Sequence, residues 1–197
     1  MRGARKSRRG FTLVETVISM AILGTVFGSI YAMLRTTSRS FTVASASTRL
    51  DTQVTETLDK IAELLRASKL STVTPQQASP FSSAQIDFQR STGFAAGATV
   101  WGNTERIALT GGNVVWTQNV GLASQTSKIL THNVPTYLQG ETANAADDNR
   151  NGLVDESGLC FNVAGTSIFV RLTLRVRSSA GQVLTHTGQQ RVFLRNR

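Results

Sequence analysis

The sequence has few of the residues on which enzyme sites and small secreted folds depend. With only one cysteine, Cys160, the chain cannot form an intramolecular disulfide, so its fold does not depend on an oxidising compartment. Cys160 is most simply a small buried apolar residue. The two histidines, His132 and His186, are far apart in the sequence and belong to no HExxH or Ser-His-Asp pattern. Gly-rich phosphate loops, GxSxG elbows and CxxC pairs are also missing, and these absences argue against an enzyme.

A membrane-anchored hydrolase is the alternative from a different class of function. It would need acidic side chains such as Asp87 and Glu105 to converge in a cleft. No spacing in the sequence indicates such a cleft, so the alternative rests on these two acids alone.

Positive charge is concentrated at the N-terminus. The first nine residues contain no acid and five basic residues, Arg2, Arg5, Lys6, Arg8 and Arg9. These five account for more than half of the formal net charge of +9. The rest of the chain is only mildly basic, which is weak evidence for nucleic acid as a partner.

One long apolar run follows the basic leader. No charged residue lies between Thr16 and Leu34, a stretch that would measure about 28 Å as a helix, roughly enough to cross a bilayer core. The positive-inside rule keeps the leader in the cytoplasm and places the chain after Arg35 outside. Because no Ala-x-Ala cleavage site follows the run, we expect a transmembrane helix rather than a removed signal peptide.

Glu15 interrupts the start of this run. A carboxylate at mid-membrane costs about 2.5–3.5 kcal/mol, although the cost is smaller near a helix end close to the interface. Either Glu15 is an ordinary acid stabilised by the helix dipole, or it has a charged partner.

The residues Gly10-Phe11-Thr12-Leu13-Val14-Glu15 resemble the class III signal of type IV pilins and of type II secretion pseudopilins. The resemblance implies that prepilin peptidase cuts between Gly10 and Phe11 on the cytoplasmic side and that Phe11 becomes the N-methylated first residue. It also implies that Glu15 pairs with the N-terminal amine of a neighbouring subunit during assembly. Burying such a pair avoids leaving either charge unpartnered in the fibre.

The same resemblance implies the partners and the location of the chain. Its partners would be other pilin or pseudopilin subunits, prepilin peptidase, an inner-membrane assembly platform and the lipid bilayer. The subunit would cross the cytoplasmic membrane once, with its head outside the cytoplasm, before it enters a pilus or pseudopilus. The stretches "RVFLRNR" and "ILTHNVPTYL" are similar to larger minor pilins and J-type minor pseudopilins, which favours a minor structural subunit.

A stripe of small residues lies within the apolar run. Gly24 and Gly28 form a GxxxG pattern, and Ala32 follows four residues later. Such a stripe lets helices approach closely in a membrane or fibre, although ordinary helix packing explains it equally well.

The pattern beyond the run predicts an α+β protein. Helical spacing of Leu50, Val54, Leu58, Ile61 and Leu65 predicts an amphipathic helix that continues to about Leu70. The predicted organisation is a cleaved leader (1–10), a transmembrane or fibre-core helix (11–34), its amphipathic continuation (35–70) and a β-rich head (71–197). Residues 71–83 read as a loop.

Several short runs in the head predict strands of an antiparallel sheet packed on the helix. These runs are residues 86–88, 106–109, 114–117, 128–131, 168–177 and 190–195. In the clearest of them, 168–177, apolar and polar residues alternate, and we expect this run to pair with 190–195 through a turn at 178–182.

The segment from Asp147 to Glu156 resembles a calcium-binding loop. Side-chain oxygens at loop positions 1, 3, 5 and 9, glycine at position 6 and a main-chain carbonyl at position 7 wrap Ca²⁺ in EF-hand loops. Gly158 stands at position 12 in place of the usual bidentate Glu, and Glu156 would supply the missing oxygens. The alternative is a solvated Asn-Gly turn. The predicted ligands are Asp147, Asn149, Asn151, Leu153, Asp155 and Glu156.

Arg171, Arg175 and Arg177 would share the outward face of the 168–177 strand. Such a row could contact DNA phosphates, which makes a DNA-binding minor pilin of an uptake fibre the second alternative. A solvated strand face that discourages pairing with other sheets explains the same row.

Overall fold

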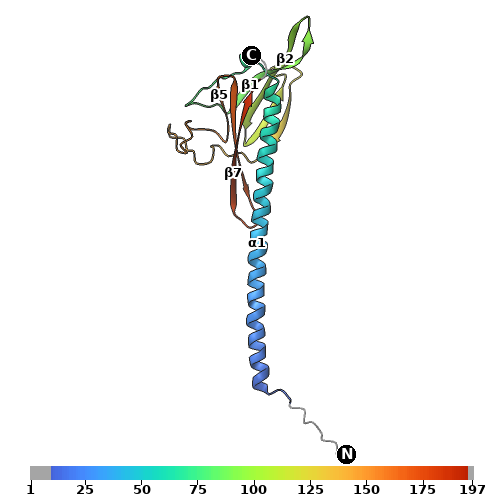
Figure 1. The fold of residues 1–197 in the computed structure, drawn as a ribbon, viewed down its shortest axis with the longest axis vertical. Helices are drawn as coiled ribbons and strands as arrows, with labels where there is room; N and C mark the ends of the chain where they lie inside the picture. Colours follow the sequence, from blue (N-terminus) through green and yellow to red (C-terminus); the bar gives the residue numbers. More distant parts are fainter. Residues whose placement is uncertain (1–9, 195–197) are drawn as a thin grey trace, which may run out of the picture.

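The structure is a computed structural model that describes residues 10–194. Its dominant element is helix α1 (Leu13–Arg66), a single rod of 54 residues. The N-terminal half of α1 projects away from the rest of the molecule, and the C-terminal half lies along the β-strands (Figure 1). The basic leader, residues 1–9, lies outside the described part of the chain.

Helix α1 ends at Arg66 rather than at the predicted Leu70. The hydroxyl and the amide of Ser68 both donate to the carbonyl of Leu65, at 2.6 Å and 2.9 Å. Ser68 also forms an isolated bridge with Arg90, which draws the backbone toward the sheet. A serine that bonds locally in this way competes with the helical pattern, and a short 3-10 helix, η1 (Leu70–Thr72), follows.

The head contains two antiparallel sheets rather than the single sheet that we predicted. The first has the order β1 (Gln85–Ala95), β2 (Ala98–Thr110), β3 (Asn113–Gln118) and β4 (Thr126–Thr131). The second has the order β5 (Leu159–Ala164), β6 (Ser167–Arg177) and β7 (Val183–Phe193). Five of the six predicted strand regions lie wholly in strands. The last, 190–195, lies in β7 up to Phe193, Leu194 follows the strand, and Arg195 falls outside the described residues.

Strand β5 was missed because its residues do not alternate. Five of its six residues, from Leu159 to Val163, are buried, and the buried set includes Cys160, as expected. The lengths of β1 and β2 were underestimated for the opposite reason, since the distal part of their hairpin, around Phe94 and Ala98, is exposed. Neither pattern has the half-buried alternation from which strands are recognised.

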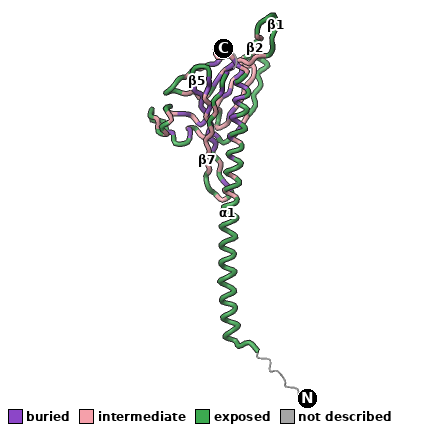
Figure 2. The backbone as a smooth tube through the Cα atoms, in the orientation of Figure 1, coloured by how far each residue is buried: buried purple, intermediate pink, exposed green. Residues whose placement is uncertain are grey.

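The core lies between the C-terminal half of α1 and the two sheets (Figure 2). The predicted apolar stripe is confirmed, because all five of its side chains are buried: Leu50, Val54, Leu58, Ile61 and Leu65. They pack against β6 and β7, whose pairing through the 178–182 turn is also as predicted. A long helix packed on antiparallel sheets confirms the α+β fold class.

Candidate functional site

The predicted processing site lies just before the helix. Gly10 and Phe11 are exposed and precede Thr12, the N-cap residue of α1, so the bond between them is outside any helical turn. No atom lies within 4 Å of a Cβ placed on Gly10. The fold itself therefore leaves room for a side chain at Gly10, and any demand for glycine there comes from a partner such as the peptidase.

Glu15 closes a capping box at the start of α1. Its amide donates to the hydroxyl of Thr12 at 3.2 Å, and its Oε2 accepts from the amide and the hydroxyl of Thr12, both at 3.1 Å. This arrangement satisfies donors that the first turn of a helix would otherwise leave free. In the single subunit, Glu15 is thus an exposed helix-cap residue whose only described partner is Thr12.

The N-terminal half of α1 presents apolar side chains on all sides. Phe11 is 83% exposed and Phe27 is 62% exposed, and α1 contains an apolar stretch long enough to cross a membrane, with none of it buried by the rest of the chain. A Cβ added at Gly24 or Gly28 would meet no atom within 4 Å. A surface of this kind is stable only when lipid or other helices cover it.

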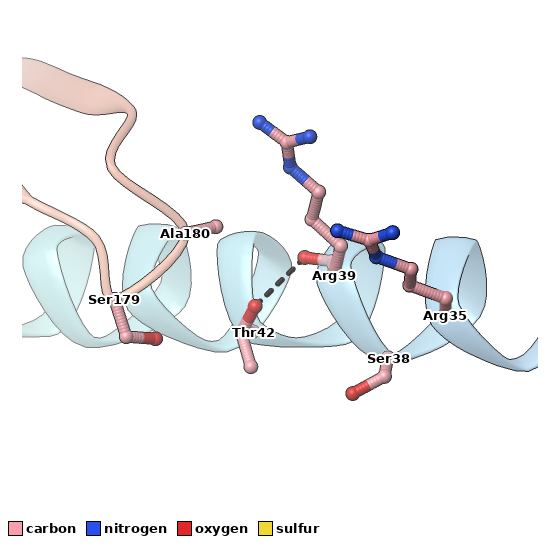
Figure 3. A pocket seen from close by; sticks show the side chains of 6 residues that line it. All are labelled: Arg35, Ser38, Arg39, Thr42, Ser179 and Ala180. Carbon is pink, nitrogen blue, oxygen red and sulfur yellow. Dashed lines mark hydrogen bonds between the residues drawn. The ribbon is translucent and has the colours of Figure 1, made fainter.

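The exposed part of α1 meets the head at a shallow depression of about 490 Å³ (Figure 3). Arg35 and Arg39 extend from one side of the helix there, while Ser179 and Ala180 approach from the β6–β7 turn. The lining has no carboxylate, thiol or imidazole, and it includes none of the predicted site residues. It marks the junction between the apolar rod and the head.

The predicted calcium loop lies in the long connection between β4 and β5, which extends from the side of the head (Figure 1). Asp147 accepts from the amides of Asn151 and Gly152, at 3.0 Å and 2.8 Å. The side-chain oxygen of Asn149 accepts from the amide of Asn151, and that of Asn151 accepts from the amide of Leu153. The loop is therefore wound tightly, with oxygens of Asp147, Asn149 and Asn151 on its inside.

Two carboxylates are buried against this loop. Glu156 is fully buried and Glu141 is 6% exposed. Oε1 of Glu156 accepts from Nδ2 of Asn151 at 2.6 Å, and Oε1 of Glu141 accepts from the amide of Asn149 at 3.0 Å. Burial raises the pKa of Glu141, and the nearby charges of Glu156, Asp148 and Asp147 raise it further. No spacing in the sequence marks Glu141, which precedes the loop.

Asp155, a predicted ligand, is directed elsewhere. Its carboxylate accepts from the amides of Asn144 and Ala145 at 2.9 Å and 3.0 Å, and it makes no described contact with the side chains of Asp147, Asn149 or Asn151. Across the described residues, 10–194, no three His, Cys, Asp or Glu side chains are grouped as a ready-made metal site. A cation here would need amide and main-chain oxygens as well as carboxylates.

The acids of the hydrolase alternative do not converge. Asp87 forms a double hydrogen-bonded ion pair with Arg106, at 2.7 Å for each bond. Glu105 binds Arg90 and the indole of Trp116, both at 2.7 Å. Since Glu105 and Arg106 are successive on one strand, the two ion pairs lie on opposite faces of the sheet.

Histidines and arginines of the head have structural contacts. His186 Nε2 lies 2.9 Å from Asp51 of α1, and His132 Nδ1 lies 2.9 Å from the side-chain oxygen of Asn113. The prediction that three arginines form an exposed row is wrong for Arg171. Its side chain is 16% exposed, and its guanidinium lies 3.7 Å from Glu156. Arg175 and Arg177 are exposed as predicted, but two arginines are weak support for a DNA-binding surface.

Comparison with protein families finds the prokaryotic N-terminal methylation motif at residues 5–31. The match covers the end of the leader, the Gly10–Phe11 bond, Glu15 and most of the apolar run. Comparison with curated proteins and with solved structures gives no match. The motif, the long apolar helix and the β-sheets of the head together give this chain a type IV pilin-like architecture that begins with an N-terminal methylation motif.

Proposed function

We propose that this protein is a minor structural subunit of a type IV pilus or of a type II secretion pseudopilus. The observation that carries the proposal is the division of α1 into two halves. From Leu50 to Leu65 the helix is part of the core of the head, whereas from Leu13 to Leu34 its apolar side chains are exposed in the single chain. The exposed half needs a cover, and lipid before assembly and neighbouring helices afterwards both supply one.

Processing between Gly10 and Phe11 would create a new charged group at the right place. The amine of Phe11 would then lie two residues before the first residue of α1, Leu13. Every subunit would therefore carry a positive charge at Phe11 and a negative charge at Glu15, four residues apart. In the fibre, the amine of one subunit pairs with Glu15 of the next. A charged amine is a stronger hydrogen-bond donor to a carboxylate than the neutral amide and hydroxyl of Thr12, so it can displace the capping box.

A minor role is favoured by the shape of the head. The connection between β4 and β5 is long and irregular, and the only cysteine, Cys160, is buried and free. Many major pilins instead carry a disulfide. On this proposal the subunit contributes by assembly with other subunits on an inner-membrane platform.

The test compares Glu15→Ala with Glu56→Ala in the native host. Both changes remove one exposed acid from α1, but Glu56 lies on the head half of the helix. We expect both variants to enter the membrane, and only Glu15→Ala to be missing from sheared fibres, because it alone lacks the partner for the neighbouring amine. Incorporation of Glu15→Ala at the wild-type level would refute the assembly role.

Mass spectrometry of the mature protein tests processing separately. We expect a mass that begins at Phe11 with an added methyl group, and Gly10→Ala is expected to impair that cleavage. A mature chain that still begins at Met1 would contradict the proposal. A deletion strain scored for secreted enzymes and for surface fibres would then distinguish the secretion machine from the pilus.

A further inference from the structure

We infer that the 147–152 loop and the buried carboxylates of Glu141 and Glu156 form a binding site for one Ca²⁺ ion. This site is independent of the assembly function proposed above. It also differs from the ligand set that the loop pattern predicts, because Glu141 enters the set and Asp155 leaves it.

The first argument is that each buried carboxylate has an oxygen without a partner. Glu141 and Glu156 use Oε1 to bind Asn149 and Asn151, and Oε2 of both residues is buried with no hydrogen bond. A carboxylate oxygen that is removed from water and left unpaired is strongly unfavourable. Native structures rarely accept this cost twice at one place unless an ion or water supplies the missing contact.

The second argument is charge. Of the twelve acidic residues in this basic chain, five lie between residues 141 and 156: Glu141, Asp147, Asp148, Asp155 and Glu156. Two cations are near this group. Arg150, within the loop, is exposed and has no described ion pair, and the guanidinium of Arg171 lies 3.7 Å from Oε1 of Glu156, the oxygen that Asn151 already binds. The unpaired oxygens of Glu141 and Glu156 therefore lack a cation.

The third argument is the chemistry of the donors. The loop provides oxygens from Asp147, Asn149 and Asn151, and these adjoin the two glutamates through the hydrogen bonds from Asn149 and Asn151. An all-oxygen set of carboxylates, amides and carbonyls suits a hard cation, whereas zinc prefers nitrogen and sulfur. The set is irregular and built on a loop, which suits Ca²⁺ better than Mg²⁺ with its strict octahedral geometry.

The structure also explains why position 12 of the loop has no ligand. A Cβ on Gly158 would lie 2.1 Å from the carbonyl oxygen of Pro135, so no residue with a side chain fits there. Glu141, which precedes the loop in sequence and binds the amide of Asn149, takes over the role of a second acidic ligand.

The test is Ca²⁺ binding by the detergent-solubilised full chain after chelator treatment, measured by calorimetry and by the shift of the thermal midpoint. We expect binding with a Kd of about 10⁻⁴–10⁻³ M, the range of extracellular calcium modules, and a much smaller response to Mg²⁺. Glu141→Gln and Glu156→Gln should each weaken Ca²⁺ binding at least tenfold. Asp155→Asn is the matched control, and it should change the Kd less than threefold because Asp155 binds Asn144 and Ala145 instead.

Glu141→Gln has a second readout, its thermal midpoint with and without Ca²⁺. Without the ion, this variant should melt at a higher temperature than the wild type, since it removes a buried charge that Glu156 repels. With Ca²⁺, the wild type should melt at the higher temperature. No shift of the wild-type midpoint at about 10 mM Ca²⁺ would overturn the inference. An equal Ca²⁺ response of the wild type and both glutamine variants would overturn the ligand set.

Discussion

At the scale of single residues, Gly158 has the least room for a side chain among the described glycines. Its backbone enters β5 directly beneath the carbonyl of Pro135, and its amide donates to the carbonyl of Thr136 at 3.1 Å. Its φ lies outside the left-handed region, so the glycine is required for space and not for an unusual backbone conformation. The same close contact fixes the position of the loop that holds Glu156.

We predict that Gly158→Ala lowers the free energy of unfolding by about 1–3 kcal/mol or more, because a backbone carbonyl cannot move aside as a side chain can. Urea titration of the detergent-solubilised full chain, followed by circular dichroism, measures the change. Gly24→Ala is the control, since no atom lies within 4 Å of its added Cβ and alanine favours a helix. Equal stability of the two variants would show that the contact at Pro135 relaxes freely.

At the scale of elements, helix α1 packs tightly against β7 at Gly188. A Cβ on Gly188 would lie 2.5 Å from Cγ1 of Val54 and 2.8 Å from Cδ1 of Leu58. On the same interface, Asp51 binds His186 and Asp59 accepts a hydrogen bond from Gln190 at 3.0 Å. The absence of a side chain at Gly188 therefore lets the helix pack closely on the sheet. The polar contacts of Asp51 and Asp59 add to this interface where it is exposed.

We predict that Gly188→Ala destabilises the head by about 1–3 kcal/mol through overpacking, and that Val54→Ala costs a similar amount by opening a cavity. The double variant should be less destabilised than the sum of the two, because removing Cγ1 of Val54 makes room for the new methyl group. Denaturant midpoints of the four proteins complete the cycle. Simple additivity would mean that the helix shifts as a rigid body instead.

At the scale of the whole molecule, the rod and the head are separate in their energetics. Every buried apolar side chain of α1 lies at or beyond Leu50, and the described residues from Phe11 to Leu34 are exposed. Apolar burial is the main source of stability, so the first half of α1 adds almost nothing to folding of the single chain. Its apolar surface serves contacts with lipid and with other subunits.

We predict that a fragment that begins at Thr36 is folded, soluble and monomeric. Its thermal midpoint should lie within about 2–4 °C of that of the full chain in detergent, which corresponds to roughly 1 kcal/mol for a domain of this size. Differential scanning fluorimetry and size-exclusion chromatography measure both properties. A large drop in the midpoint would mean that the rod contributes to the stability of the head.

By itself, the sequence determined the features that depend on neighbouring residues. The apolar run, the basic leader and the Gly10–Glu15 motif are local patterns, and the family match at residues 5–31 covers most of them. The apolar stripe from Leu50 to Leu65 was also predictable from the sequence, because residues on the buried face of a helix recur at a regular spacing of three or four. These patterns sufficed for an α+β protein with an apolar N-terminal helix.

Only the tertiary structure decided the features that depend on residues distant in sequence. The division of the head into two sheets was not predicted, since β5 is buried along most of its length and shows no alternation by which the strand could be recognised. Arg171 turns onto Glu156, and Asp87 and Glu105 each pair with an arginine of the neighbouring strand. The sequence also left open which carboxylates face the 147–152 loop, because only the fold brings Glu141 beside Asn149. The physical reason is the same in each case: burial and charge pairing depend on the path of the whole chain.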